Sequence, residues 1–140
     1  MIEQILKGKN IRSACKQVVS NKGSAGVDGM TVKELPRYFK ANRKDLCERI
    51  RSDKYFAQAI LGVEIPKENG KKRLLGIPTV VDRLLQQAVH QIISPKFEVE
   101  FTEHSYGFRP NRNAHQAILQ AQKYIHEGYN YIVDLDLNPD

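Results

Sequence analysis

The middle of the sequence carries its clearest signal for β-structure, and this signal limits the fold to a class that combines helices with a small sheet. Residues 59–65 and 72–77 are two β-prone runs that flank Pro66–Lys71. Asn69-Gly70 lies between them, and this dipeptide is typical of a tight hairpin turn because both residues tolerate positive φ. The sequence therefore predicts one antiparallel hairpin over residues 59–77.

Helical periodicity dominates on both sides of this hairpin. Apolar residues recur at intervals of three and four in residues 2–19 (with a break near 8–10), 38–53, 80–94 and 114–125. Thr31-x-x-Glu34 and Thr79-x-x-Asp82 have the spacing of helix N-terminal caps, while Pro95 and Gly128 are expected to end helices. The predicted core stripe of the third segment is Leu84, Leu85, Ala88, Val89, Ile92 and Ile93, and the predicted inward face of the fourth is Ala114, Ala117, Ile118, Ala121 and Ile125. The predicted fold class is α+β, mostly helical with a small antiparallel β-hairpin.

The last stretch, Asn130–Leu137, alternates polar and apolar residues, and this period of two predicts a strand. The apolar residues can face a core, while Asp134 and Asp136 share the opposite face. A carboxylate at the end of a core strand can hold a divalent metal ion. A strand that simply ends in solvated acids is the alternative that this pattern leaves open.

Composition and charge fit one folded domain with an anionic partner. The net charge is +6 in 140 residues, which favours a polyanion such as nucleic acid. No apolar run approaches the roughly 20 residues of a membrane span, so we expect no membrane partner. Cys15 and Cys47 lie far apart without a Cys-x-x-Cys spacing. They predict buried free thiols in a reducing compartment, and hence a cytoplasmic, bacterial-type location.

Three polar segments are candidates for ligand contact. Residues 21–30 contain three glycines, which let a backbone approach phosphate closely, although a plain linker fits as well. Residues 105–113 place two arginines beside aromatic rings, which suits stacking and phosphate contact; an exposed loop anchored by Phe108 is the alternative. The basic hairpin tip can keep an exposed strand soluble, or Arg73 can reach phosphate oxygens bidentately.

Five blocks of the sequence together resemble a known family, in its order and spacing. The blocks are Gly26-Val-Asp-Gly29, Val63-Glu-Ile-Pro-Lys67, Arg73-Leu-Leu-Gly-Ile-Pro-Thr-Val-Val-Asp-Arg83, Tyr106-Gly-Phe-Arg-Pro-Asn-Arg-Asn-Ala-His115 and Ile132-Val-Asp-Leu-Asp136. The chain resembles the N-terminal part of a group II intron-encoded reverse transcriptase/maturase. The resemblance implies a fingers domain over residues 1–130, including an N-terminal extension over 1–54, and a truncated first palm strand over 131–140. Reverse transcriptases of retrons, diversity-generating elements and CRISPR-linked systems share the same chemistry and stay open as alternatives.

The resemblance implies a catalytic and nucleotide-binding set. Asp136 matches the first palm aspartate, so it would be a catalytic residue and a ligand of Mg²⁺, with the carbonyl of Leu137 nearby. Lys67 and Arg73, on opposite arms of the hairpin, would hold the triphosphate of the incoming dNTP. Position 61, often basic in the family, is Leu61, which puts one triphosphate contact in doubt.

The resemblance also implies contacts with RNA. The expected partners are intron RNA and an RNA template with a DNA primer, while the oligomeric state stays open, with a dimer among the alternatives. The residues implied in template or RNA binding are Lys22, Gly23, Ser24, Ile77, Pro78, Arg83, Arg109 and Arg112.

The sequence departs from the family after Asp136, where Asn138-Pro139-Asp140 replaces the start of the usual run. The Tyr-x-Asp-Asp motif of the palm is absent from these 140 residues. We therefore expect the parent protein to be an RNA-directed DNA polymerase and the fragment alone to be inactive. An RNA-binding module without catalysis is the second hypothesis.

Overall fold

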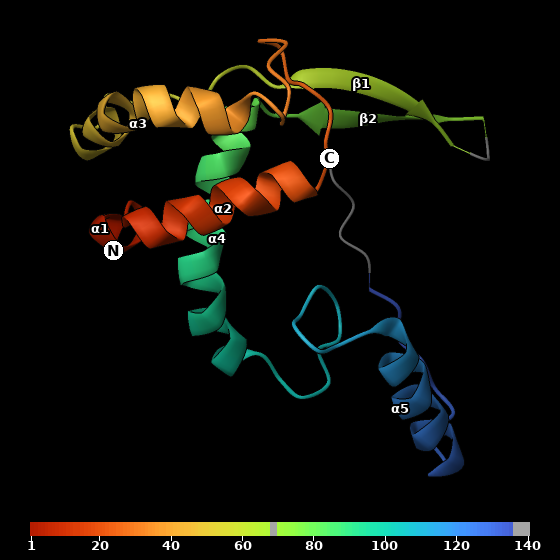
Figure 1. The fold of residues 1–140 in the computed structure, drawn as a ribbon. Coiled ribbons are helices and arrows are strands. Elements are labelled where there is room, and N and C mark those ends of the chain that lie inside the picture. Colours follow the sequence, from red (N-terminus) through yellow and green to blue (C-terminus); the bar gives the residue numbers. More distant parts are fainter. Residues whose placement is uncertain (68–69, 136–140) are drawn as a thin grey trace. The chain divides into compact units, whose positions relative to one another are not determined.

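The computed structural model describes residues 1–67 and 70–135, and it divides into two compact units, Met1–Lys96 and Phe97–Asp140 (Figure 1). The predicted class is confirmed, because the described chain is mostly helical with one two-stranded antiparallel sheet. The expected fingers domain, residues 1–130, spans both units. Its functional boundary with a palm strand stays a prediction.

The first unit contains most of the regular structure. Its elements are α1 (Ile2–Ile5), α2 (Gly8–Ser20), α3 (Leu35–Arg51), β1 (Leu61–Pro66), β2 (Lys72–Ile77) and α4 (Val80–Phe97), of which only Phe97 belongs to the second unit. The first helical segment is broken as expected, but at residues 6 and 7; residues 8–10, where the break was expected, already belong to α2. The Glu34 carboxylate accepts hydrogen bonds from the Thr31 N–H (2.8 Å) and hydroxyl (2.7 Å), which is one half of the predicted capping box. The other half is not formed, because α3 begins only at Leu35, with Glu34 as its N-cap and without a side-chain cap hydrogen bond.

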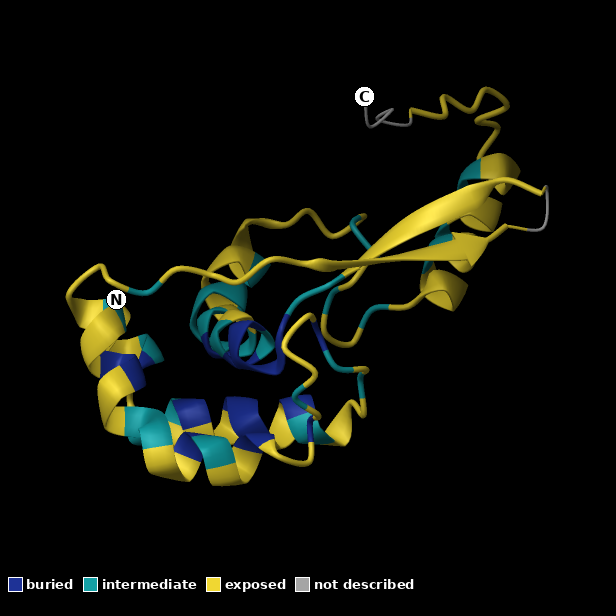
Figure 2. Cartoon of the chain, turned by 90° about the horizontal axis from the view of Figure 1, so that it is seen from above, coloured by how far each residue is buried: buried dark blue, intermediate teal, exposed yellow. Residues whose placement is uncertain are grey.

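The core of the first unit lies where α2, α3 and α4 face one another. Ile11, Leu35, Val80 and Leu84 have no solvent exposure, and Figure 2 shows the buried positions gathered on these helices. Full burial of a side chain of this size stabilises the folded state by roughly 1.5–3 kcal/mol. This core fixes α2 and α4, which carry the candidate site.

The hairpin pairs β1 with β2 in the predicted antiparallel arrangement. Ile65 pairs with Arg73 and Leu61 with Ile77, and the Lys67 N–H donates to the Lys71 carbonyl (2.7 Å), so the same register extends beyond the strands. Gly70 has a φ of 76°, as a tight turn requires, while Asn69 lies outside the described residues.

The start of α4 is fixed by a buried carboxylate, Asp82, which is 5% exposed. Its carboxylate accepts hydrogen bonds from the hydroxyls of Tyr55 (2.6 Å) and Thr79 (2.6 Å) and from the Gln58 N–H (3.2 Å). In return, the backbone N–H of Asp82 donates to the Thr79 Oγ1 (3.2 Å). The predicted Thr79-x-x-Asp82 helix start is therefore confirmed. It also ties α4 to the segment that leads into the hairpin.

The Tyr55→Phe substitution should lower the free energy of unfolding by about 1–2 kcal/mol near neutral pH, because Asp82 loses one of its donors. Burial, and then the hydrogen bond to Asp82, raises the pKa of Tyr55 above its ordinary value, so the folded state holds the phenol proton more tightly than the unfolded chain. This wild-type advantage is complete below the unfolded pKa of about 10 and is lost as the pH rises through the folded pKa. Urea unfolding of both proteins at about pH 7 and about pH 11 tests this, and a difference that does not shrink at the higher pH would contradict it.

The second unit contains η1 (Glu98–Glu100) and α5 (Ala114–His126). Asn113 and Gln116 form a complete capping box at the start of α5, in which the Gln116 N–H donates to Asn113 and the Asn113 N–H to Gln116. Gly128, at a φ of 96°, ends the helix as predicted, with its N–H donating to the Ile125 carbonyl and that of Tyr129 to the Tyr124 carbonyl.

Two details of the predicted helices are wrong. Pro95 does not stop α4, which continues to Phe97, because a proline in the last turn removes only one further hydrogen bond near an end where carbonyls are unpaired anyway. The predicted inward face of α5 is not buried, and Ile118 and Ile125 are 56% and 54% exposed. The periodicity correctly predicts an amphipathic helix, but the described residues of the second unit supply no surface that covers it.

The predicted terminal strand is also not observed in residues 130–135, which belong to no strand. Tyr131 and Leu135 are 98% and 89% exposed. A strand needs a neighbour for its backbone hydrogen bonds, and among the described residues these six pair with no other strand. Residues 136 and 137, the rest of the predicted strand, lie outside the described residues.

Candidate nucleic-acid interface

The glycine-containing segment 21–30 is a loop, as predicted, and it lies against the junction of β2 and α4 in the first unit. Gly26 is buried there, and a Cβ atom on it would lie 2.8 Å from the Thr79 Cα and 2.9 Å from the Thr79 nitrogen. These are main-chain atoms next to a fully buried helix start, so they cannot move aside. The close approach therefore requires glycine, and it holds the loop beside Arg83.

The Gly26→Ala substitution should displace this loop, because its Cβ would overlap the Thr79 backbone. We expect the free energy of unfolding to fall by about 1–3 kcal/mol, the usual cost of forcing an extra group into a packed site. Gly29→Ala offers a control, since a Cβ there meets nothing within 4 Å but sits at a φ of 70°. Gly29→Ala therefore measures the effect of backbone strain without steric overlap. An equal loss of unfolding free energy in both variants would show that overlap with Thr79 is not the cause.

Arg83, in the first turn of α4, reaches the same loop. Its Nη2 donates to the Ser24 carbonyl, and its Nη1 lies next to Gly23. Its Nε is buried and lacks a hydrogen-bond partner among the described residues. Buried N–H groups are rarely left unpaired, so this donor would gain a hydrogen bond from a small movement of the Arg83 side chain toward an acceptor.

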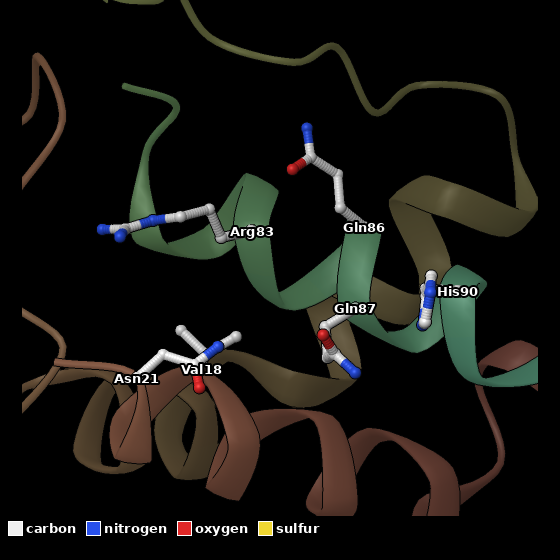
Figure 3. A pocket seen from close by; sticks show the side chains of 6 residues that line it. All are labelled: Val18, Asn21, Arg83, Gln86, Gln87 and His90. Carbon is white, nitrogen blue, oxygen red and sulfur yellow. The ribbon is translucent and has the colours of Figure 1, made fainter. Parts of the chain in front are cut away.

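A cavity of about 390 Å³ opens beside Arg83, between α2 and α4 (Figure 3). Most of its lining side chains both donate and accept hydrogen bonds, so the cavity can bond the edges of bases and the hydroxyls of ribose. The lining residues are Val18, Asn21, Arg83, Gln86, Gln87 and His90.

Sequence reasoning missed four residues of this cavity, the three amides and His90. The available signal was the polar stripe of α4, in which Arg83, Gln87 and His90 follow one another at helical spacing. Asp82 was recognised only as a cap. Its partner Tyr55 carried no local signal, because the two residues meet only in the folded chain.

The hairpin carries the predicted nucleotide-binding pair on one face. Because cross-strand partners share a face and side chains alternate, the register places Arg73 beside Ile65, and its continuation to Lys67 and Lys71 puts the Lys67 position on that same face. Both Lys67 and Arg73 are exposed. Within the described residues neither side chain forms an ion pair, whereas Lys72, on the opposite face, is paired with Glu64 at 2.6 Å.

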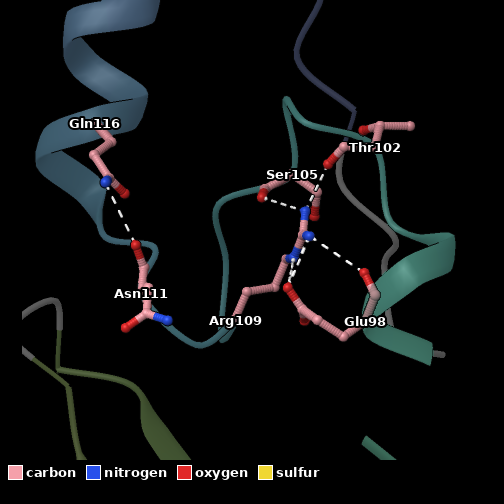
Figure 4. Close-up of polar contacts among 6 residues, drawn as sticks. All are labelled: Glu98, Thr102, Ser105, Arg109, Asn111 and Gln116. Carbon is pink, nitrogen blue, oxygen red and sulfur yellow. Dashed lines mark hydrogen bonds and ion pairs between the residues drawn. The ribbon is translucent and has the colours of Figure 1, made fainter. Parts of the chain in front are cut away.

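In the second unit, Arg109 organises the loop that precedes α5 (Figure 4). Its Nη1 donates to the carbonyls of Thr102 (2.6 Å) and Ser105 (3.0 Å), and its Nε and Nη2 donate to the Glu98 carboxylate (3.1 and 2.8 Å), with a longer contact to the Glu98 carbonyl. The guanidinium also lies 5.1 Å from the Phe101 ring centroid. All five N–H groups are thereby used inside the loop. Its implied contact with RNA stays a prediction.

Phe108 does not anchor this loop. Its side chain is fully exposed, and its φ of 55° lies in the left-handed region that non-glycine residues rarely adopt. Arg112 lies 5.4 Å from the Tyr106 ring centroid, so its charge is held against an aromatic face. The loop thus presents the exposed Phe108 ring and, four residues later, the Arg112 cation stacked on Tyr106.

The structure brings together part of the predicted set. Gly23, Ser24 and Arg83 are in contact, and Lys22 adjoins them, while Ile77 and Pro78 lead directly into the Thr79 junction. Lys67 and Arg73 lie at the far end of the hairpin. Arg109 and Arg112 belong to the second unit, and Asp136 and Leu137 lie outside the described residues.

The described residues provide no metal site of their own. Over residues 1–67 and 70–135, no group of three or more histidine, cysteine or acidic side chains could hold a metal ion. The expected Mg²⁺ site depends on Asp136, which is not described. The buried Cys15 does not suggest a metal site either, because burial raises the pKa of its thiol and favours the protonated form.

A family model described as reverse transcriptase (RNA-dependent DNA polymerase) matches residues 65–139, more than half of the chain. The chain belongs to this family. The match runs from the hairpin through α4, the Arg109 loop and α5. The resemblance inferred from the five sequence blocks is confirmed.

Curated relatives extend the similarity toward the N-terminus. Protein YkfC of Escherichia coli is 35% identical over 120 residues, covering 84% of this chain and 32% of the relative. The group II intron-encoded protein LtrA of Lactococcus lactis is 34% identical over 125 residues, covering 89% and 20%. The putative COX1/OXI3 intron 2 protein of Saccharomyces cerevisiae is 27% identical over 120 residues, covering 84% and 13%. The chain therefore spans a third or less of the length of these relatives. Among the described residues, no helix is long and apolar enough to cross a membrane.

Proposed function

We propose that this chain is the fingers region of a group II intron-encoded reverse transcriptase, whose whole protein copies RNA into DNA and assists the splicing of its intron. Membership in the reverse transcriptase family supports the polymerase activity. The relatives with intron-encoded names support the intron association. The region's proposed part in the reaction is to bind RNA and to position the incoming dNTP.

The observation that carries the RNA-binding role is the contact between the glycine loop and Arg83. Gly23 and Ser24 meet the Arg83 guanidinium, its Nε lacks a partner in the described chain, and a cavity lined by amides opens beside it. A cation beside adaptable amide groups suits a phosphate–ribose backbone, which offers anionic oxygens and hydroxyls in alternation. Arg112, on its aromatic support, would add a contact from the second unit.

The role proposed for the hairpin is to hold the triphosphate. Lys67 and Arg73 are exposed, and no carboxylate among the described residues forms an ion pair with either of them. Arg73 could bind two phosphate oxygens with one planar fork, while Lys67 acts as a point charge. Ile77 and Pro78 would pack beside the templating base.

Catalysis itself is assigned to Asp136, with the carbonyl of Leu137, as part of a site for Mg²⁺. When bound, the metal ions would stabilise the attacking and leaving oxygens of nucleotidyl transfer. One carboxylate does not make a two-metal site, so for the 140 residues alone we expect RNA binding without DNA synthesis.

The salt dependence of RNA binding tests the proposal. We expect the affinity for a fluorescein-labelled RNA with a single-stranded overhang to fall steeply with added KCl, because cationic side chains displace counterions from phosphates. The double variant Lys22→Ala/Arg112→Ala should reduce the slope of log K against log [KCl] by about 0.7 per removed contact. Fluorescence anisotropy at several salt concentrations measures this slope.

Lys54→Ala/Lys96→Ala is the matched control, because both lysines are exposed, lie outside the candidate site, and their loss changes the net charge equally. The control should keep the wild-type slope. Equal slopes for the two double variants would show that RNA binding depends on the net charge of the chain and not on the positions of Lys22 and Arg112. A wild-type affinity that does not change with salt would overturn the proposed RNA contacts.

A further inference from the structure

A second surface of the first unit has a different chemistry from the candidate nucleic-acid interface. A groove of about 600 Å³ lies between α2 and α3. Its lining residues come from one continuous stripe of each helix, from Arg12 to Ser20 on α2 and from Pro36 to Arg43 on α3. Their spacing of three and four residues makes each stripe a single helical face.

The floor of this groove is apolar. It includes Cys15, Val19 and Phe39, of which Cys15 and Phe39 are 8% and 7% exposed. Because burial raises the pKa of the Cys15 thiol, this sulfur stays protonated and uncharged at neutral pH. Phe39 is too deeply buried to offer a ring face for base stacking, so the floor suits aliphatic side chains better than nucleobases.

The rim of the groove is cationic on both sides. Arg12 and Lys16 contribute from α2, and Lys40 and Arg43 from α3. In the described chain none of these four forms an ion pair. Further along α3, by contrast, Arg49 forms an ion pair with Asp45 and Arg51 forms one with Glu3. Like charges at these helical spacings destabilise a helix slightly, so the rim is held without an internal counter-charge.

The two arginines are also placed where positive charge is least favoured. A Cβ on Gly8 would lie 2.8 Å from the Arg43 Nη2 and 3.3 Å from the Arg12 Nη1, so both guanidinium groups meet over the first residue of α2. A helix N-terminus carries partial positive charge and favours anions. Carboxylates brought by a partner would relieve this concentration of charge.

We infer that the groove between α2 and α3 binds an acidic amphipathic helix of a protein partner. Apolar side chains at every third or fourth position of that helix would enter the floor, and flanking carboxylates would meet the four rim cations. The charge complementarity carries this choice of partner. An RNA duplex offers the anions but has no apolar ridge to fill the floor, and the site lies outside the glycine loop, the hairpin and the Arg109 loop assigned to template and dNTP.

The test uses the full 140-residue chain and a designed probe. The probe is a fluorescein-labelled helical peptide of about 14 residues, roughly four turns, with leucines on one face and glutamates beside them. Fluorescence anisotropy should show saturable binding. Replacing the leucines with serines at unchanged charge should weaken binding at least tenfold, about what loss of buried apolar area predicts.

Two variants locate the binding surface. Lys16→Glu/Lys40→Glu reverses one exposed cation on each side of the groove, and it should weaken peptide binding about tenfold or more. Lys54→Glu/Lys96→Glu makes the same substitutions at exposed lysines outside the groove and should change the affinity by less than about threefold. Circular dichroism of both variants confirms that the helices are intact.

Four outcomes would overturn the inference. The first is that the wild-type chain does not bind the peptide, and the second is that both double variants weaken peptide binding equally, which would indicate general electrostatics alone. The third is that the serine peptide binds as tightly as the leucine peptide, which would exclude a role for the apolar floor. The fourth is that Lys16→Glu/Lys40→Glu loses RNA binding and keeps peptide binding, which would make the groove part of an RNA surface. The RNA contacts proposed at Lys22 and Arg112 are tested separately, by the salt-slope experiment.

Discussion

Asp82→Ala should lower the free energy of unfolding of the first unit by about 3 kcal/mol, the largest loss expected from one side chain here. The substitution leaves the hydroxyls of Tyr55 and Thr79 and the N–H of Gln58 without their acceptor in a buried or half-buried setting. Each such donor costs about 1–3 kcal/mol when water cannot replace the lost partner, and partial access of water to Tyr55 and Gln58 reduces the sum. Urea unfolding followed by far-ultraviolet circular dichroism measures the loss.

Asp45→Ala provides the comparison, because Asp45 is exposed and its pair with Arg49, at 3.9 Å, is a surface contact within α3. Its removal should cost less than about 0.5 kcal/mol. If Asp82→Ala costs as little as Asp45→Ala, the start of α4 is held by its apolar packing alone. Asp82→Asn should fall between the two, since an amide oxygen still accepts from part of the set.

Arg109→Ala should release the loop before α5, with a local loss of about 2–3 kcal/mol in its opening free energy. The Arg109 side chain is 8% exposed, and its removal leaves the carbonyls of Thr102 and Ser105 and the Glu98 carboxylate without their donors. The Glu98 side chain is 31% exposed, so water compensates that carboxylate in part. Hydrogen exchange of the backbone amides in residues 98–112 should become roughly ten- to a hundredfold faster.

Two variants separate the structural role of Arg109 from direct RNA contact. Arg109→Lys keeps the charge but places its donors on one nitrogen, so we expect it to restore only a small part of the protection. Arg112→Ala removes a cation stacked on Tyr106 and should leave exchange in the loop nearly unchanged. Loss of RNA binding in Arg109→Ala with wild-type exchange would show that Arg109 contacts RNA itself, contrary to the role that its five hydrogen bonds indicate.

The parts of the fold that were predictable from the sequence depend on neighbours along the chain. The hairpin follows from two β-prone runs around one turn, and the start of α4 follows from the three-residue spacing of Thr79 and Asp82. The Schellman motif that ends α5 is likewise local, because it requires only one residue with positive φ, Gly128. In each case the sequence segment contains all the atoms that make the structure.

The parts that were missed depend on residues far apart in the sequence or on absent neighbours. Nothing local shows that Gly26 meets the backbone of Thr79, or that Tyr55 reaches Asp82. Nothing local shows that the Arg109 guanidinium donates to the carbonyls and carboxylate of its own loop, while the nucleic-acid contact that the arginines and aromatic rings of residues 105–113 favour stays a prediction. For α5 and residues 130–135, alternation indicates which side is apolar, while only a partner surface decides whether that side is buried.

The bonds of Arg109 have a thermodynamic consequence for anything that binds the loop it organises. A flexible loop must lose conformational freedom when it meets a ligand, and this loss weakens the complex. Here the loop backbone on either side of Phe108 is tied by the Arg109 bonds to the Thr102 and Ser105 carbonyls, and the Arg112 side chain is held against Tyr106. The loop has thus already lost conformational freedom when the chain folds. A ligand of this loop should therefore bind with a smaller entropic penalty, and the loop should change its shape little on binding.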